Sequence, residues 1–171
     1  MKRLHAVLAA VFCTLLLVSC TKRPEQKEII LGTETVGVMM PVGKEVVHPI
    51  HGKEVWFAVG AMNGEGETLA NGVAQSHVFA DNASIVTVNL NIHPASKGSS
   101  FVAWVSKSGS KEKVRLDRLQ NPLNDVRHVI TVDLPKDLRE YTNVIVTLEH
   151  DSGPSETDPV QATGTLVVRK R

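Results

Sequence analysis

The sequence has few aromatic residues and almost no net charge. Its 171 residues include four Phe, two Trp and one Tyr, and 19 Lys and Arg stand against 18 Asp and Glu, a net charge of +1. So few rings argue against a platform that stacks bases or sugars. A protein that binds a polyanion normally carries a large basic excess, so nucleic acid is not an expected partner. The hydrophobic content of 42% is too high for a disordered chain, and the length suits one domain.

Cysteine is also scarce, and Cys13 and Cys20 are the only two in the sequence. A basic start at Met1–Arg3 precedes an almost wholly apolar stretch, Leu4–Val18. This layout is typical of a secretory signal, and at about 15 residues the apolar stretch is short for a membrane span. The end of the stretch, Leu17-Val18-Ser19-Cys20, resembles a bacterial lipobox, in which the cysteine receives a diacylglyceryl group and becomes the first residue of the mature protein.

The lipobox resemblance implies that residues 1–19 are removed and that Cys20 is the lipidation site. Two or more acyl chains, palmitate among them, would anchor the protein stably to the cell membrane or outer membrane, facing outside the cytoplasm. Cys13 leaves with the signal, so no disulfide is expected and the domain must be held by its core. Residues 21–28 contain no aliphatic residue, so residues 20–28 are interpreted as the lipidated cysteine and a tether.

From residue 29 onward, apolar side chains alternate with polar ones instead of following a helical period. The clearest example is 84–92, where every second residue from Val86 to Ile92 is apolar. We therefore expect residues 29–171 to form an all-β domain, an antiparallel, Ig-like β-sandwich of about eight strands. Further strands are expected at 55–59, 73–80, 101–106, 113–118, 126–134, 143–150 and 164–169, with a weaker one at 36–40 or 46–47.

Turn residues separate these strands. Gly and Asn accept a positive φ at little cost and therefore mark hairpins and loops. Such residues occur at Asn63–Gly66, Asn71-Gly72, Asp81-Asn82, Ser108-Gly109 and Asp151–Pro154. The only helix candidate is Lys136–Tyr141, which would form about one and a half turns.

The last third of the chain resembles the end of the extracytoplasmic domain of anti-sigma-K factors. The matching pieces are a strand at Tyr141–Glu149, a loop with Gly153-Pro154 and a closing strand at 160–166. Two earlier pieces, Thr68–Ala74 and Phe101–Val105, are similar to early strands of that domain. The resemblance spans about residues 45–169 and implies a β-sandwich outside the membrane.

The resemblance does not carry anti-sigma activity. Those anti-sigma factors also have a cytoplasmic segment that grips the sigma factor, followed by a membrane-spanning helix. The sequence shows no counterpart of either part, and a shared fold alone never establishes a function.

One pattern is compatible with a metal site. His48-Pro-Ile-His51 has a spacing found in metal sites, and Met39 and Met40 lie just upstream. Imidazole and thioether ligands together suit copper. The alternative interpretation is that His48 and His51 decorate a loop while one of the methionines packs in the core. We therefore expect no cofactor and keep copper as the alternative.

Nothing in the sequence predicts an enzyme. Ser108-Gly-Ser-Lys111 reads as Ser-x-x-Lys, but the Ser-Asp-Asn and Lys-Thr-Gly motifs that accompany it in penicillin-binding enzymes are absent. Nucleophile-elbow, zinc-protease and phosphate-loop motifs are also missing. Trp56 and Trp104 are expected to pack the two sheets together, and Tyr141 to bind the main chain as a tyrosine corner does. Glu149 should point to solvent or to a neighbouring cation.

The sequence thus predicts an envelope lipoprotein with a non-catalytic binding or sensory β-sandwich. Its expected partners are membrane lipid, through Cys20, and another envelope protein. The basic tail, Arg169–Arg171, is interpreted as a solvated chain end that could alternatively touch anionic headgroups.

Overall fold

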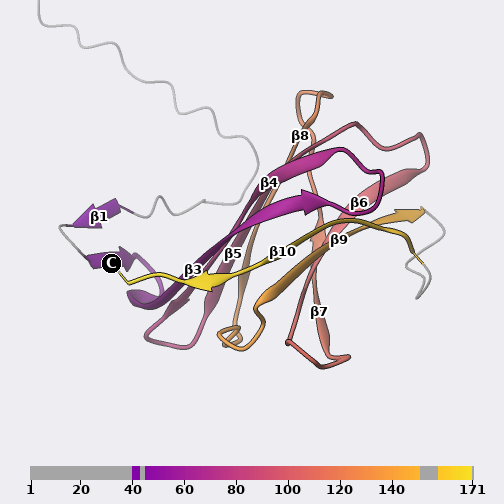
Figure 1. Cartoon of the computed structure of the whole chain (residues 1–171). Helices are drawn as coiled ribbons and strands as arrows, with labels where there is room; N and C mark the ends of the chain where they lie inside the picture. Colours follow the sequence, from indigo (N-terminus) through magenta and orange to yellow (C-terminus); the bar gives the residue numbers. More distant parts are fainter. Residues whose placement is uncertain (1–39, 43–44, 151–157, 171) are drawn as a thin grey trace, which may run out of the picture. The chain divides into compact units, whose positions relative to one another are not determined.

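The computed structural model describes residues 40–42, 45–150 and 158–170, all within the unit Gly37–Arg171 (Figure 1). The signal sequence, Cys20, the tether, Met39 and the turn at Asp151–Pro154 lie outside the described residues. The described part is all-β. Its strands are β1 (Met40–Val42), β2 (Glu45–His48), β3 (Gly52–Gly64), β4 (Ala70–Phe79), β5 (Ser84–Ile92), β6 (Ser99–Ser106), β7 (Lys113–Arg118), β8 (Arg127–Leu134), β9 (Asn143–His150), β10 (Val160–Thr165) and β11 (Val167–Val168).

Every strand pair in this sheet is antiparallel, as expected. The strand order is β7-β6-β9-β10-β3-β4-β5-β8, with β1, β2 and β11 attached along β3. The sheet curls until its two ends meet, because Gln120 and Val129 exchange backbone hydrogen bonds of 2.8 and 2.9 Å. The result is sandwich-like, with β3, β4, β5 and β8 in one layer and β7, β6, β9 and β10 in the other.

The hydrophobic core lies between these two layers. Strict alternation sends every second side chain of each strand inward, so Val88 of β5 and Val146 of β9 are fully buried while Asn89 is exposed. Both layers contribute to one cluster, which confirms the apolar face expected for 84–92.

Trp104 does not pack between the layers. Phe101, Ala103 and Val105 take the inward positions of β6, so Trp104 points outward. There its indole N–H donates to Thr147 at 3.0 Å. Trp56, by contrast, packs against the core as expected.

The turn expected at Asn71-Gly72 is wrong, because both residues lie inside β4. Strand β3 is 13 residues long, far longer than 55–59, and the chain turns at Gly66-Glu67, where Gly66 has a φ of +61°. Gly72 has a packing role instead. A Cβ at this position would lie 2.1 Å from the carbonyl oxygen of Asn89, so only glycine lets β4 and β5 approach this closely.

The helix expected at Lys136–Tyr141 is also wrong. The Ser84 hydroxyl donates to the carbonyl of Lys136 at 2.6 Å and accepts the N–H of Leu138 at 3.0 Å. A helix over this segment would need the Lys136 carbonyl for its own first hydrogen bond, from the N–H of Glu140. The segment forms bends and a turn, which allows Leu138 and Tyr141 to enter the core.

The last strand divides into two pieces. A single strand was expected at 164–169, but β10 ends at Thr165 and β11 begins at Val167. Leu166 between them is buried in the core, and its N–H donates to the carbonyl of Thr142 at 2.7 Å. Leu166, whose side chain points inward and whose N–H bonds to a third segment, therefore separates the two strands.

Candidate functional site

The two histidines of the predicted metal motif are brought together. His48 ends β2 and His51 lies in the turn before β3, and their rings stack with centroids 4.8 Å apart and planes 14° apart. Phe79 of β4 packs against both rings at 5.3 and 5.8 Å. Nδ1 of His48 accepts the backbone N–H groups of Ile50 and His51, each at 3.3 Å, so this nitrogen shapes the turn.

His51 bridges two carboxylates. Its Nδ1 lies 2.7 Å from Oδ2 of Asp81, in the loop between β4 and β5, and its Nε2 lies 2.8 Å from Oδ2 of Asp133 in β8. The protonated imidazole can donate to both carboxylates. Its hydrogen bond to Asp133, followed in size of effect by the one to Asp81, raises the pKa of His51. The same contact with His51 lowers the pKa of Asp81.

This arrangement does not aim the two imidazoles at one point. A metal ion lies in the plane of each ring that binds it, and stacked rings have separate planes. The side chain of Met40 and all of Met39 lie outside the description. Within the described ranges, no three His, Cys, Asp or Glu side chains are grouped to hold one metal ion. Copper at these residues therefore stays a prediction, and binding would require His51 to leave its aspartates. Thermal unfolding measured at increasing copper concentrations tests this prediction.

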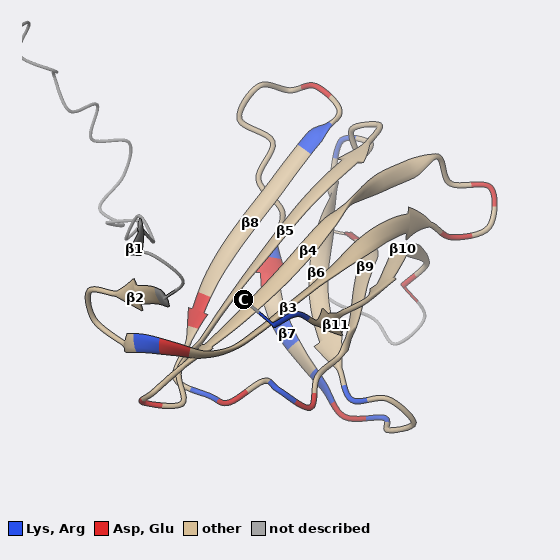
Figure 2. Cartoon of the chain, turned by 60° about the vertical axis from the view of Figure 1, so that its left-hand side comes forward, with Lys and Arg blue, Asp and Glu red and all other residues tan. Residues whose placement is uncertain are grey.

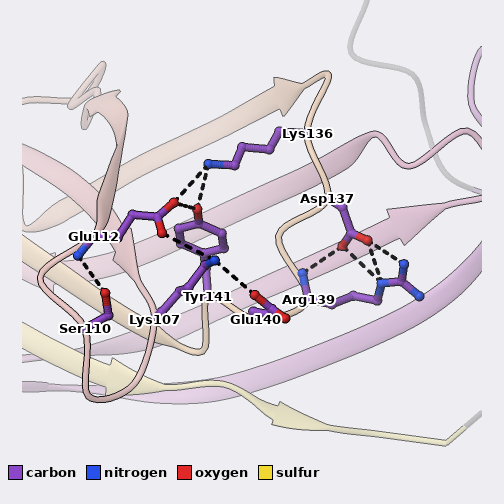
Figure 3. A network of polar contacts seen from close by, with 8 residues as sticks. All are labelled: Lys107, Ser110, Glu112, Lys136, Asp137, Arg139, Glu140 and Tyr141. Carbon is purple, nitrogen blue, oxygen red and sulfur yellow. Dashed lines mark hydrogen bonds and ion pairs between the residues drawn. The ribbon is translucent and has the colours of Figure 1, made fainter.

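A second polar cluster, which sequence reasoning missed, surrounds Tyr141 (Figure 3). A cleft of about 520 Å³ opens between the β6–β7 hairpin and the segment that joins β8 to β9. Tyr141 is 2% exposed, but its hydroxyl reaches the cleft, where it donates to Glu112 and accepts from Nζ of Lys136 at 2.6 Å. The hydroxyl was expected to bind the main chain and binds these side chains instead.

Charges around this hydroxyl alternate in sign. Nζ of Lys107 lies 3.3 Å from Glu112 and 3.0 Å from Glu140. The bond from Tyr141, followed by the one from Lys107, lowers the pKa of Glu112. The ammonium groups of Lys107 and Lys136 also lie 5.1 and 4.6 Å from the centroid of the Tyr141 ring, within cation–π range.

Each of these charged groups is paired within the cluster, so a ligand entering the cleft would have to exchange an existing ion pair. The arrangement is suited to holding the hairpin to the β8–β9 segment. No local pattern marks it in the sequence, because Glu112 and Tyr141 are 29 positions apart.

Two carboxylates are buried, which the sequence analysis did not predict. Glu54 binds Nδ1 of the buried His77 at 2.5 Å, in a polar pair that packs against Phe57. Glu149, on the outer face of β9, is 3% exposed and meets Nη2 of Arg115 at 3.1 Å. The expected neighbouring cation of Glu149 is therefore present, but the carboxylate is buried rather than solvated.

No family model, no curated protein and no solved structure matches this chain. The resemblance to anti-sigma-K factors therefore stays a prediction from the sequence. In the part of the chain that the structure describes, no helix is long and apolar enough to cross a membrane.

Proposed function

We propose that the protein is an envelope lipoprotein, anchored through Cys20, whose β-sandwich is a non-catalytic binding module for another envelope protein. The lipobox-like sequence and the tether support the anchor. The all-β fold agrees with the sandwich that the anti-sigma-K resemblance implies, and no sigma-factor activity is proposed with it.

The observation that carries the binding role is an uncharged outer face on the layer of β3, β4, β5 and β8. Neither β4 nor β5 contains Asp, Glu, Lys or Arg, and Figure 2 shows charge on this layer only near the strand ends. The register aligns three outward rows across the four strands, and all but one of their residues are uncharged: Asn63, Asn71, Asn91, Ala61, Val73, Asn89, Val129, Val59, Gln75, Thr87 and Thr131. The exception is Arg127, at the start of β8. We call this surface the amide face.

The amide face combines small aliphatic side chains with amides and hydroxyls. Val73 and Val129 are 39% and 37% exposed. The Asn91 amide donates to Asn71 at 3.0 Å, and the Thr87 and Thr131 hydroxyls are 3.0 Å apart, so side chains are ordered across the strands. Depletion of charge at the centre of a surface is the compositional mark of protein interfaces, which supports a protein partner.

Cross-linking in intact cells tests this role. A photo-reactive residue in place of Asn89, at the centre of the amide face, should yield a discrete adduct with one envelope protein. The same residue in place of the exposed Lys97, in the loop before β6, is the matched control. Asn89→Arg places a charge in the face and should abolish capture through a probe at Val73, while Lys97→Glu should not. Equal adducts from Asn89 and Lys97, or none from Asn89, would reject the amide face as the binding surface.

A further inference from the structure

Exposed aliphatic side chains gather at one end of the sandwich. Among the residues that the structure describes, eleven large hydrophobic ones are exposed, and five of them belong to β2, the following turn, the first half of β3 and β11. They are Val47, Ile50, Val55, Val167 and Val168. Ile50 is the most exposed of the five, at 79%.

The register makes these residues neighbours along one edge of β3. Val47 pairs with Lys53, and Val168 and Val167 pair with Ala58 and Val59. Lys53 and Val59 are six positions apart, about 20 Å along a strand. The five residues therefore lie along one edge of β3, where Val167, beside Val59, and Val168, beside Ala58, point to opposite faces of the sheet.

Basic residues lie on the same edge. The N–H of Arg169 donates to the carbonyl of Phe57 at 3.0 Å, which places the C-terminal segment directly beside β3. Arg169 and Lys170 are both exposed. Asp81 and Asp133 are paired with His51, and Glu54 is paired with His77. We name the five aliphatic residues together with Arg169 and Lys170 the basal patch.

An apolar surface with basic residues beside it fits a bilayer with anionic headgroups, because aliphatic side chains enter the interface and cations meet the lipid charge. The basal patch also lies at the end of the sandwich that β1 and β2 lead into, and 19 residues separate Cys20 from Met40. Nineteen residues can span about 25 Å even as a random coil, so an anchored domain could reach the headgroups with this end. A weak contact would suffice, because the anchor makes docking intramolecular.

We propose that the basal patch docks the domain on the anionic lipid surface that holds Cys20. The proposal rests on the lipid anchor proposed above. It concerns a second contact with the membrane, made by the folded domain rather than by the acyl chains.

The test uses the lipidated protein reconstituted into vesicles, with an environment-sensitive fluorophore on a single introduced cysteine. Ile50→Cys labels the basal patch, and Leu69→Cys labels an aliphatic residue of similar exposure, 82%, beyond the far end of β3. In phosphatidylcholine vesicles containing phosphatidylglycerol, the label at Ile50 should report an apolar environment and the label at Leu69 an aqueous one. An aqueous environment at both positions would overturn the proposal.

Charge removal separates lipid docking from other causes of the signal. Arg169→Ser with Lys170→Ser should reduce the ratio of docked to undocked domain, read from the two lifetimes of the Ile50 label, about 25-fold, at about fivefold per basic residue. Lys97→Ser is the control and should leave the ratio unchanged. An unchanged ratio in the double variant would contradict the proposal. Failure of the unlabelled protein to acquire lipid at Cys20 would instead reject the anchor, so the two failures are distinguishable.

Discussion

At the residue scale, His51 connects three segments through one ring, and this connection should depend on pH. Because its folded pKa is raised above the reference value of 6.5, the His51 contribution to stability is present below pH 6.5 and is lost as the pH rises through the folded pKa. The pKa of Asp81 is lowered below 3.8, so its contribution is present above that pH and is lost in acid. The bridge is therefore fully formed between about pH 4 and pH 6.5.

Thermal unfolding across this range checks the prediction. The melting temperature of His51→Gln should lie furthest below that of the wild type near pH 5.5, and the two should converge toward pH 8.5. His93→Gln, which changes an exposed loop histidine, is the control. A difference between wild type and His51→Gln that stays constant over this range would refute a charged bridge.

The hydroxyl of Tyr141 provides a second test at this scale. Tyr141→Phe keeps the buried ring but removes the bonds to Glu112 and Lys136, both of which are about half exposed. We expect the free energy of unfolding to fall by about 1 kcal/mol, because solvent screens these partners. That loss corresponds to about 2–4 °C in melting temperature for a domain of this size. Glu140→Gln, at an exposed position, should change it far less, and a Tyr141→Phe variant as stable as wild type would show that the hydroxyl bonds add no stability.

Single residues were the hardest feature to predict from the sequence. The motif of His48 and His51 was visible, but the partners of His51 lie 30 and 82 positions away, in segments that only the folded sheet brings together. The bond between Tyr141 and Glu112 was missed for the same reason, because these two residues are also far apart in the sequence. The type of a polar residue is known from the sequence, whereas the partner that it binds depends on the strand register.

At the scale of single elements, strict alternation was a reliable guide. The strands at 84–92, 113–118 and 143–150 have the expected bounds, since each alternates apolar and polar residues between clear ends. The wrong predictions concern residue types that occur in two different structural settings. Gly72 resembles a turn glycine but permits a close contact between strands, and Leu138 resembles a helix residue but fills the core.

Gly72 gives the test at this scale. Gly72→Ala would put a Cβ 2.1 Å from the Asn89 carbonyl oxygen, so β4 and β5 must separate locally. We expect the free energy of unfolding to fall by about 2–3 kcal/mol, measured by urea denaturation. The adjacent variant Asn71→Ala changes an exposed position and should cost less than about 1 kcal/mol. A Gly72→Ala variant as stable as wild type would mean that β4 and β5 are further apart than described.

At the scale of the whole molecule, the sequence predicted the class of fold but not the strand order. Pairings such as β6 with β9 and β3 with β10 join segments far apart in the chain, and no local pattern encodes them. Strand order assembles the two surfaces proposed to bind a partner and lipid, the amide face from four strands and the basal patch from β2, β3, β11 and the turn between β2 and β3. Neither surface can be located in the sequence before the strand order is known.

The central claim is that this sandwich is held at a membrane by lipid on Cys20. The most direct measurement is mass spectrometry of the N-terminal peptide from protein purified out of the membrane fraction of cells that export it. The account predicts a chain that starts at Cys20 and carries a diacylglyceryl group on its sulfur. A peptide that retains residues 1–19, or an unmodified Cys20 in protein from the soluble fraction, would contradict it.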